Sequence, residues 1–270
     1  ALNLVSLVRN NEIVIHEDGL QNEGLKKKAN SKVKDTLSPI FASELYVNSM
    51  QPECSNEEDL KAFTRNLDED QKKKFRASSH LLAIAYNEIG YKNLVRLTSW
   101  GWTKGFYYKP RVNHEMLLKH KEGLYFTSCC YNSEVGRAFD QGGEEPAFAM
   151  IEKYIEMFGK DNYFLELMLL DFDKQKPYDR FIIKAHDKYK LPLIVTNDCH
   201  YCNQEDSKYQ SLVMMVKTGN TIQNVQKAID EDGTQDIFEL QDTNLWMKSE
   251  EELNEKWAKD YQDIIPYELF

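Results

Sequence analysis

Short apolar runs alternate with helix-like stretches along most of this chain. Runs rich in β-branched and aromatic residues, bounded by turn residues, predict strands. Between them, apolar residues recur every three or four positions, which indicates amphipathic helices. The predicted strands are 12–16, 39–47, 80–86, 123–129, 163–169 and 192–196, and the clearest predicted helices are 90–100, 145–158 and 177–189.

This alternation predicts an α/β fold, in which helices connect the strands of a mostly parallel sheet. The 270 residues suit one domain, because α/β barrels of about 250 residues fold as single units. The segment 51–76 has the composition of a helical surface insertion between two strands. Near the end of the chain, Ser249 is followed three residues later by Glu252, which predicts a capped helix within 246–256.

Composition narrows the class of protein. Hydrophobic residues make up 41% of the chain, enough for a packed core. The chain has 34 basic and 44 acidic residues, and the net charge of −10 disfavours a broad DNA-binding face. Five cysteines, an odd number, argue against a disulfide framework and for a reducing, cytoplasmic compartment. No apolar stretch is long enough to span a membrane.

The strongest chemical signal is the Thr-Asn-Asp-Cys-His-Tyr segment at 196–201, directly after an apolar run. In an extended chain alternate side chains share a face, so Asp198 and His200 are expected to point the same way, with Cys199 opposite. A carboxylate and an imidazole so placed form half of a site for Zn²⁺, Mn²⁺ or Fe. The pair also suits an ordinary turn aspartate and a surface histidine. Cys199 and Cys202 form a C-x-x-C without the second pair that a zinc knuckle needs.

Metal-binding residue types also occur at the ends of other predicted strands. Glu44 follows the run 40–43 within the predicted strand 39–47, Cys130 follows the strand 123–129, and His80 opens the strand 80–86. In barrel-like α/β folds strand ends meet at one face, so these residues are expected to converge with Asp198 and His200 on a metal site. Each alone also suits a rim carboxylate, a satisfied histidine or a buried thiol.

Two acidic residues are weaker candidates for the same site. Asp18 lies in His-Glu-Asp-Gly at 16–19 and could add a ligand, although this segment also suits a plain Asp-Gly turn. Glu166, in the middle of a predicted strand, could face the site, but the sequence identifies no partner for it.

Several segments resemble PHP (polymerase and histidinol phosphatase) domains of the C-family replicative polymerases, the DNA polymerase III α subunits. The most specific are Gly-Phe-Tyr-Tyr-Lys-Pro-Arg at 105–111 and Thr-Asn-Asp-Cys-His-Tyr at 196–201. The resemblance runs from about residue 12 to the end of the chain. Further similar segments are 90–97, 163–167, 217–221 and 246–252.

The resemblance implies a distorted, seven-stranded, TIM-like β/α barrel whose strand ends hold up to three metal ions. It also implies the positions of the metal ligands. The family's opening His-x-His motif has no counterpart, so the first strand is expected to be missing or replaced and the single domain 1–270 to be N-terminally truncated. The family's Thr-Asp-His-Gly motif corresponds to residues 16–19 of this chain, where Asp18 occupies the position of the family's histidine. The implied ligands are Glu44, His80, Cys130 (with Glu134 fixing the register), Asp198 and His200.

By the same resemblance, the parent protein is expected to be a DNA-directed DNA polymerase that acts in replication. This chain would end before the polymerase core and would pack against the palm or thumb of the parent protein. A proofreading subunit is expected as a further partner, and contact with DNA is expected to be made by the parent protein as a whole. Because the ligand set is incomplete, a degenerate phosphoesterase or 3′–5′ exonuclease-type site with little activity is expected. Two alternatives remain: a free-standing, metal-dependent PHP phosphatase acting on a small phosphate monoester, and an interaction module that binds no metal.

Overall fold

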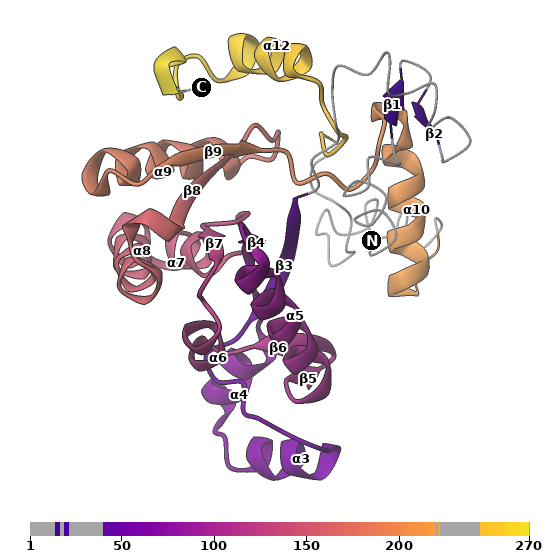
Figure 1. Ribbon diagram of the computed structural model, residues 1–270, viewed down its shortest axis with the longest axis vertical. Coiled ribbons are helices and arrows are strands. Elements are labelled where there is room, and N and C mark those ends of the chain that lie inside the picture. Colours follow the sequence, from indigo (N-terminus) through magenta and orange to yellow (C-terminus); the bar gives the residue numbers. More distant parts are fainter. Residues whose placement is uncertain (1–13, 17–18, 22–39, 220, 222–243, 270) are drawn as a thin grey trace, which may run out of the picture.

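A seven-stranded sheet forms the centre of the computed structural model, which describes residues 14–16, 19–21, 40–219, 221 and 244–269 (Figure 1). The strand order is β5-β6-β3-β4-β7-β8-β9. Helices connect and cover these strands, so the predicted α/β class is confirmed. The strands are β3 Phe41–Val47, β4 Ser79–Ala85, β5 Phe106–Tyr107, β6 Lys109–Val112, β7 Leu124–Thr127, β8 Tyr163–Met168 and β9 Leu193–Thr196.

The sheet is mixed, and the prediction of a mostly parallel sheet is wrong. Strands β7, β8 and β9 run parallel to one another, but β4 is antiparallel to both of its neighbours, β3 and β7. The cause lies in the connection after β3. The Asn48 side chain donates hydrogen bonds to the carbonyl oxygens of Lys74 (3.0 Å) and Ala77 (2.6 Å). Both ends of the insertion are therefore held together, and β4 must run back alongside β3.

Two further details differ from the sequence prediction. The first predicted strand does not join the central sheet: β1 (Val14–His16) pairs antiparallel with β2 (Gly19–Gln21) in a separate two-stranded sheet. Strands β5 and β6 were not predicted, and they extend the sheet beyond β3. Over the described residues the sheet is open, with β5 and β9 at its edges, which is compatible with a distorted barrel that lacks a strand.

The helices agree well with the sequence prediction. The insertion folds into α3 and α4, where Asp68 and Gln71 form a capping box. The predicted capping box of Ser249 and Glu252 is present at the start of α12. No described helix has the length and apolar character needed to cross a membrane. The helices are α3 Glu57–Arg65, α4 Glu69–Arg76, α5 Glu88–Thr103, α6 His114–Lys119, α7 Glu134–Gly142, α8 Glu144–Phe158, α9 Gln175–Tyr189, α10 Ser207–Thr218 and α12 Glu250–Asp260.

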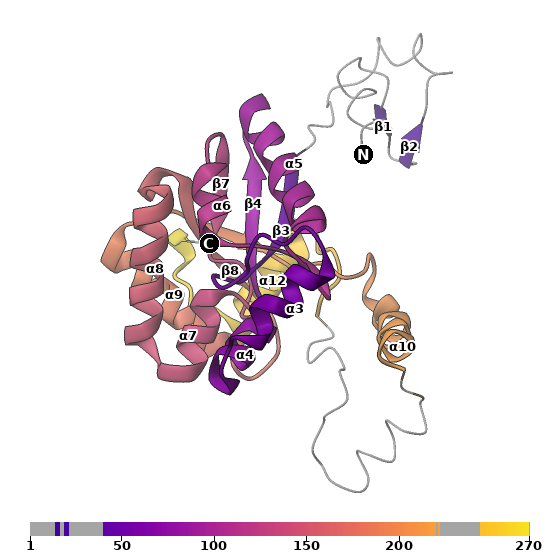
Figure 2. The ribbon, with the colours of Figure 1, turned by 90° about the horizontal axis from the view of Figure 1, so that it is seen from below.

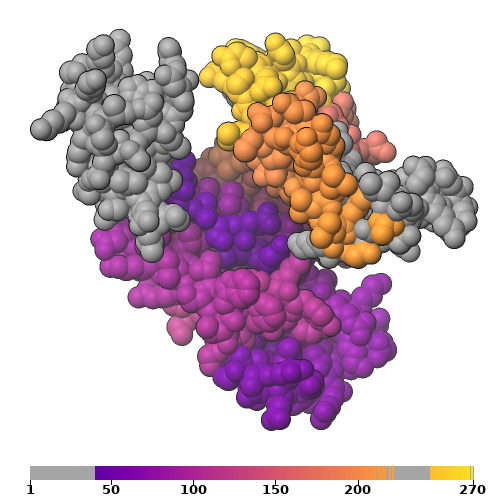
Figure 3. Space-filling view, turned by 90° about the vertical axis from the view of Figure 1, so that its right-hand side faces the viewer, coloured from indigo at the N-terminus to yellow at the C-terminus, as the bar shows by residue number. Residues whose placement is uncertain are grey.

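The main core lies between the sheet and the helices. Strand β8 is buried along nearly its whole length, as expected for a central strand covered on both faces. Phe126 of β7 stacks on Phe158 of α8 with ring centroids 3.8 Å apart. Figure 2 shows α5 on one side of β4 and α8 on the other. In Figure 3, α10 and α12 lie at the opposite end of the molecule from α3 and α4.

Candidate metal centre

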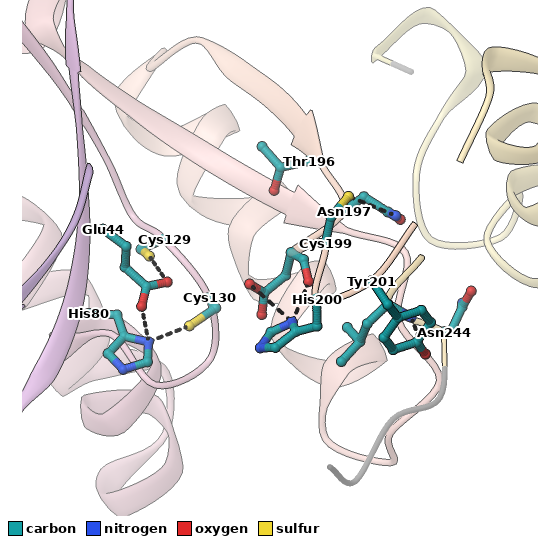
Figure 4. A network of polar contacts seen from close by, with 12 residues as sticks. Glu44, His80, Cys129, Cys130, Thr196, Asn197, Cys199, His200, Tyr201 and Asn244 are labelled. Atoms are coloured by element: carbon teal, nitrogen blue, oxygen red, sulfur yellow. Dashed lines mark hydrogen bonds and ion pairs between the residues drawn. The ribbon is translucent and has the colours of Figure 1, made fainter. Parts of the chain in front are cut away.

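Glu44 and His80 lie side by side because β3 and β4 pair in a fixed register. Tyr46 pairs directly with His80, so Glu44, two residues earlier on β3, lies on the same face as the imidazole. Glu44 Oε1 is 3.2 Å from His80 Nδ1. Two strands that are distant in the sequence thus bring an oxygen and a nitrogen ligand together (Figure 4).

Cys130 supplies a sulfur to the same place. It follows β7, and its Sγ lies 3.3 Å from His80 Nδ1. The backbone turns sharply just before it, since Cys129 has a left-handed φ of 57°. The His80 amide donates to the Asn132 carbonyl (3.1 Å), which fixes this turn against β4. The ligand atoms of Glu44, His80 and Cys130 all lie within 4.8 Å of one another.

The electrostatics of this cluster favour a thiolate at Cys130. The pKa of Cys130 is lowered to about 6, mainly by a hydrogen bond from the Cys129 thiol and to a smaller extent by the interaction with His80. Burial opposes this shift. Burial raises the pKa of Glu44, and His80 partly offsets that rise. Burial would lower the pKa of His80, but Cys130 and Glu44 raise it above its usual value. A thiolate and an imidazole are the forms that coordinate metals.

Asp198 and His200 approach the cluster from β9, but not in the predicted way. Strand β9 ends at Thr196, and Asp198 has a left-handed φ of 43°, so the segment is not extended. The two side chains are nevertheless close, with His200 Nδ1 3.9 Å from Asp198 Oδ1. Asp198 and His200 both act on the Glu44 carboxyl: Asp198 raises its pKa and His200 lowers it. Both residues are therefore close to Glu44, and Figure 4 shows His200 beside the three-residue cluster.

The proton on His200 can be placed from its partner. His200 Nδ1 lies 2.7 Å from the Asp198 carbonyl oxygen, which can only accept a hydrogen bond. Nδ1 therefore carries the proton in neutral His200, and Nε2 presents a lone pair. A backbone carbonyl that fixes the tautomer in this way is typical of metal-ligating histidines.

A strap of residues 244–248 braces this loop, a feature that the sequence did not reveal. The His200 amide donates to the Leu245 carbonyl (2.8 Å), and the Met247 amide donates to the Tyr201 carbonyl (3.2 Å). Lys248 Nζ donates to Asn197 Oδ1 (3.0 Å). The position of Asp198 and His200 thus depends on a segment that follows them by more than 40 residues in the chain.

Glu166 lies close enough to the site that, besides burial, Cys130 and Asp198 raise its pKa, and the structure shows its hydrogen-bond partners. The hydroxyl groups of Thr127 and Thr196, at the ends of the two strands that flank β8, donate to its two carboxylate oxygens. Ser128 Oγ accepts from the Glu166 amide (2.9 Å). Burial raises the pKa of Glu166, opposed by the two threonine hydrogen bonds. Glu166 therefore links β7, β8 and β9 through hydrogen bonds.

Two other sequence candidates stay apart from the cluster. Asp18 lies outside the described residues. Cys199 and Cys202 are exposed, and the Cys199 thiol lies near the Asn197 amide and the Trp246 carbonyl. All five cysteines are free thiols, as the argument against a disulfide framework predicts.

Comparison with known proteins agrees with this architecture. A family model described as "PHP domain" matches residues 19–169, more than half of the chain. The chain is also similar to proteins named DNA polymerase III subunit alpha. It is 40% identical to the one from Treponema pallidum over 139 residues, which cover 52% of this chain and 12% of that protein. It is 30% identical to the one from Borreliella burgdorferi over 222 residues, or 82% of this chain and 17% of that protein.

The DNA polymerase III subunit alpha from Aquifex aeolicus is 31% identical to this chain over 180 residues, which cover 67% of this chain and 15% of that protein. The chain thus spans less than a fifth of the length of these relatives. Because the family model covers most of the central sheet, from β3 to β8, the chain belongs to the PHP domain family.

Proposed function

We propose that this chain is the PHP domain of a DNA polymerase III α subunit, the DNA-directed DNA polymerase of replication, and that the cluster of Glu44, His80 and Cys130 binds a divalent metal ion but has little hydrolase activity. The observation that carries the metal proposal is the convergence of Glu44, His80 and Cys130 within 4.8 Å. The similarity to polymerase III α subunits carries the proposal for the parent protein.

The donor set fits a metal such as zinc. Tetrahedral zinc with bonds of about 2.0–2.3 Å places its ligands about 3.3–3.8 Å apart. The Glu44–His80 and His80–Cys130 separations are 3.2 and 3.3 Å, so only small shifts are needed. Oxygen, nitrogen and sulfur donors together suit Zn²⁺ better than Mg²⁺ or Ca²⁺, whereas Mn²⁺ and Fe favour sites with more oxygen and nitrogen ligands.

The chemistry of such a centre is that of phosphate ester hydrolysis. A bound divalent ion would lower the pKa of a water molecule and neutralise phosphate oxygens. Glu44, His80 and Cys130 would hold the ion, and Asp198 and His200 Nε2 would supply ligands or proton acceptors from the adjacent loop. Asp18 in place of the family's histidine removes a nitrogen ligand from the set. An incomplete ligand set holds metals loosely, which supports a weak phosphoesterase or exonuclease-type site and a mainly structural role.

Partners follow from the proposed parent. The rest of the polymerase chain, its palm or thumb, and a proofreading subunit are the proposed neighbours. Helix α10 offers a surface for such packing, because it stands apart from the sheet in Figure 2 and exposes large apolar side chains. These are Tyr209, Leu212, Val213 and Val216.

A hydrolase assay tests the functional part of this proposal. The purified chain is incubated with Mn²⁺ or Zn²⁺ and either a 3′-labelled DNA strand or p-nitrophenyl phosphate. We expect turnover close to the metal-only background. Robust turnover that requires the metal and disappears in His200→Ala would show an active hydrolase and overturn the structural role. Preference for the monoester would favour a phosphatase.

A further inference from the structure

A groove of about 820 Å³ lies between helices α3 and α4 and the turn around β5. None of the candidate metal ligands lines it. Its volume falls in the range of about 300–1,000 Å³ that is typical of ligand pockets. Helices α3 and α4 lie at the far end of the molecule from α12 (Figure 1). The groove is therefore a second feature of the fold, separate from the metal centre.

Basic side chains from both helices line this groove. Lys61 and Arg65 are four residues apart on α3, and Lys72 and Arg76 are four residues apart on α4, so each pair shares one helix face. The one acidic lining residue, Glu57, pairs with Lys61 at 2.7 Å. The lining thus carries a net positive charge in a chain whose net charge is −10.

Two of these four cations remain available to a ligand. Lys72 pairs with Glu69 at 2.8 Å, as Lys61 does with Glu57. Arg65 and Arg76 are exposed, and within the described ranges no carboxylate lies at ion-pair distance from either. Their guanidinium groups can each hold a phosphate through two parallel hydrogen bonds.

Aromatic rings from the turn around β5 also line the groove. Phe106 and Tyr108 are 45% and 85% exposed, which is unusual for side chains of this size. Tyr108 has a left-handed φ of 57°, a rare conformation for a bulky residue. Trp102 stacks on Phe106 with ring centroids 5.5 Å apart. The turn around β5 thus presents aromatic faces to solvent beside the arginines.

We infer that this groove binds single-stranded nucleic acid, with phosphates at Arg65 and Arg76 and bases stacked on Tyr108 and Phe106. Exposed rings next to unpaired cations match the way in which proteins bind single strands without sequence preference. Duplex DNA keeps its bases stacked and offers them no free faces. An acidic peptide would use the arginines but has no need of the rings. The inference goes beyond the proposed metal centre and does not depend on it.

Fluorescence anisotropy with a labelled oligo-dT of about ten nucleotides tests the inference. The full 270-residue chain is titrated at several salt concentrations. The double variant Arg65→Gln/Arg76→Gln should bind about tenfold or more weakly. The slope of log affinity against log salt should fall by about 1.4, because each lost phosphate contact on a single strand contributes about 0.7. Arg180→Gln/Lys184→Gln on α9 is the charge-matched control, because it also removes two exposed cations, here ones that already pair with Asp263 and Glu144.

Tyr108 tests the stacking part of the inference. Tyr108→Ala should weaken binding about fivefold or more, and Tyr108→Phe should retain it, since only the ring face is needed. Circular dichroism confirms that the variants are folded. Metal chelation should leave binding unchanged, which separates this site from the metal centre.

Three results would overturn the inference. The wild-type chain could fail to bind oligo-dT at low salt. The α9 control could lose as much affinity as the groove variant. Polyglutamate of matched charge could displace the oligonucleotide as well as unlabelled oligo-dT does, which would identify an acidic protein partner instead.

Discussion

The buried cation Arg111 holds the insertion 51–76, with helices α3 and α4, against the sheet. Replacing Arg111 therefore tests how the insertion is packed. The side chain is 1% exposed. Its guanidinium donates to Gln51 Oε1 through Nε (2.8 Å) and to the Phe75 carbonyl oxygen (2.5 Å). It also lies over the rings of Phe75 and Tyr107, 4.4 and 4.6 Å from their centroids. Burial lowers the pKa of Arg111 to about 10.

The cost of replacing Arg111 by methionine can be worked from these contacts. Arg111→Met leaves the acceptors on Gln51 and Phe75 buried without a donor, at about 1–3 kcal/mol each. Removing a buried charge recovers part of this loss. The expected net loss in the free energy of unfolding is about 2–4 kcal/mol, with a fall in Tm of roughly 5–10 °C. Arg111→Lys should recover little, because an ammonium group cannot make the forked contacts.

Urea denaturation followed by circular dichroism measures this loss. Lys109→Met is the matched control, because Lys109 is exposed and lies over the Tyr46 ring at 4.2 Å. That variant should change stability by less than about 1 kcal/mol. A loss at Arg111→Met no larger than at Lys109→Met would refute the account of how α3 and α4 are held.

Two further changes probe the packing at other places. Gly90→Ala should destabilise the fold by about 3 kcal/mol or more, because a Cβ at this position would lie 1.7 Å from the Gly123 carbonyl oxygen. Gly101→Ala should cost far less, because the nearest atom to a Cβ at that position is 3.3 Å away. Thermal melts of the two variants compare the losses. Burial would raise the pKa of Glu134, but the hydrogen bond with His114 (2.7 Å) holds it below 4.5. The stabilising contribution of Glu134 is therefore complete above about pH 4.5 and is lost as the pH falls through the lowered pKa. Glu134→Gln should lose about 1–2 kcal/mol at pH 7, and urea midpoints of wild type and variant should converge in acid; a constant gap at all pH values would contradict this reasoning.

The sequence was informative about local structure and less so about strand direction. Apolar runs located five strands of the sheet because buried strands need continuous β-branched and aromatic residues. The orientation of β4 was missed, since it depends on the long-range hydrogen bonds of Asn48, which no local pattern reveals. Strands β5 and β6 were missed because they are short and contain Pro110.

The candidate site was partly predictable for a similar reason. Glu44, His80 and Cys130 were expected to converge because strand ends meet. The structure does bring them together, but Glu44 lies in the middle of β3 and reaches His80 through the antiparallel register of β3 and β4. The hydroxyl partners of Glu166 were not expected, since threonines at strand ends are common and carry no distinctive spacing. The prediction of an extended backbone at 196–200 was wrong, because Asp198 has a left-handed backbone conformation. Aspartate tolerates this conformation better than most residues do.

The central claim is that Glu44, His80 and Cys130 bind one metal ion together, and a zinc titration of the chelator-treated chain tests it most directly. Isothermal calorimetry should show a tight site in the wild-type chain and at least about tenfold weaker binding in Cys130→Ser. Cys202→Ser, which changes an exposed cysteine, should bind as the wild type does. With Co²⁺, the sulfur-to-metal charge-transfer band should be present in Cys202→Ser and absent in Cys130→Ser. Equal zinc affinity and an unchanged cobalt band in Cys130→Ser would contradict the account.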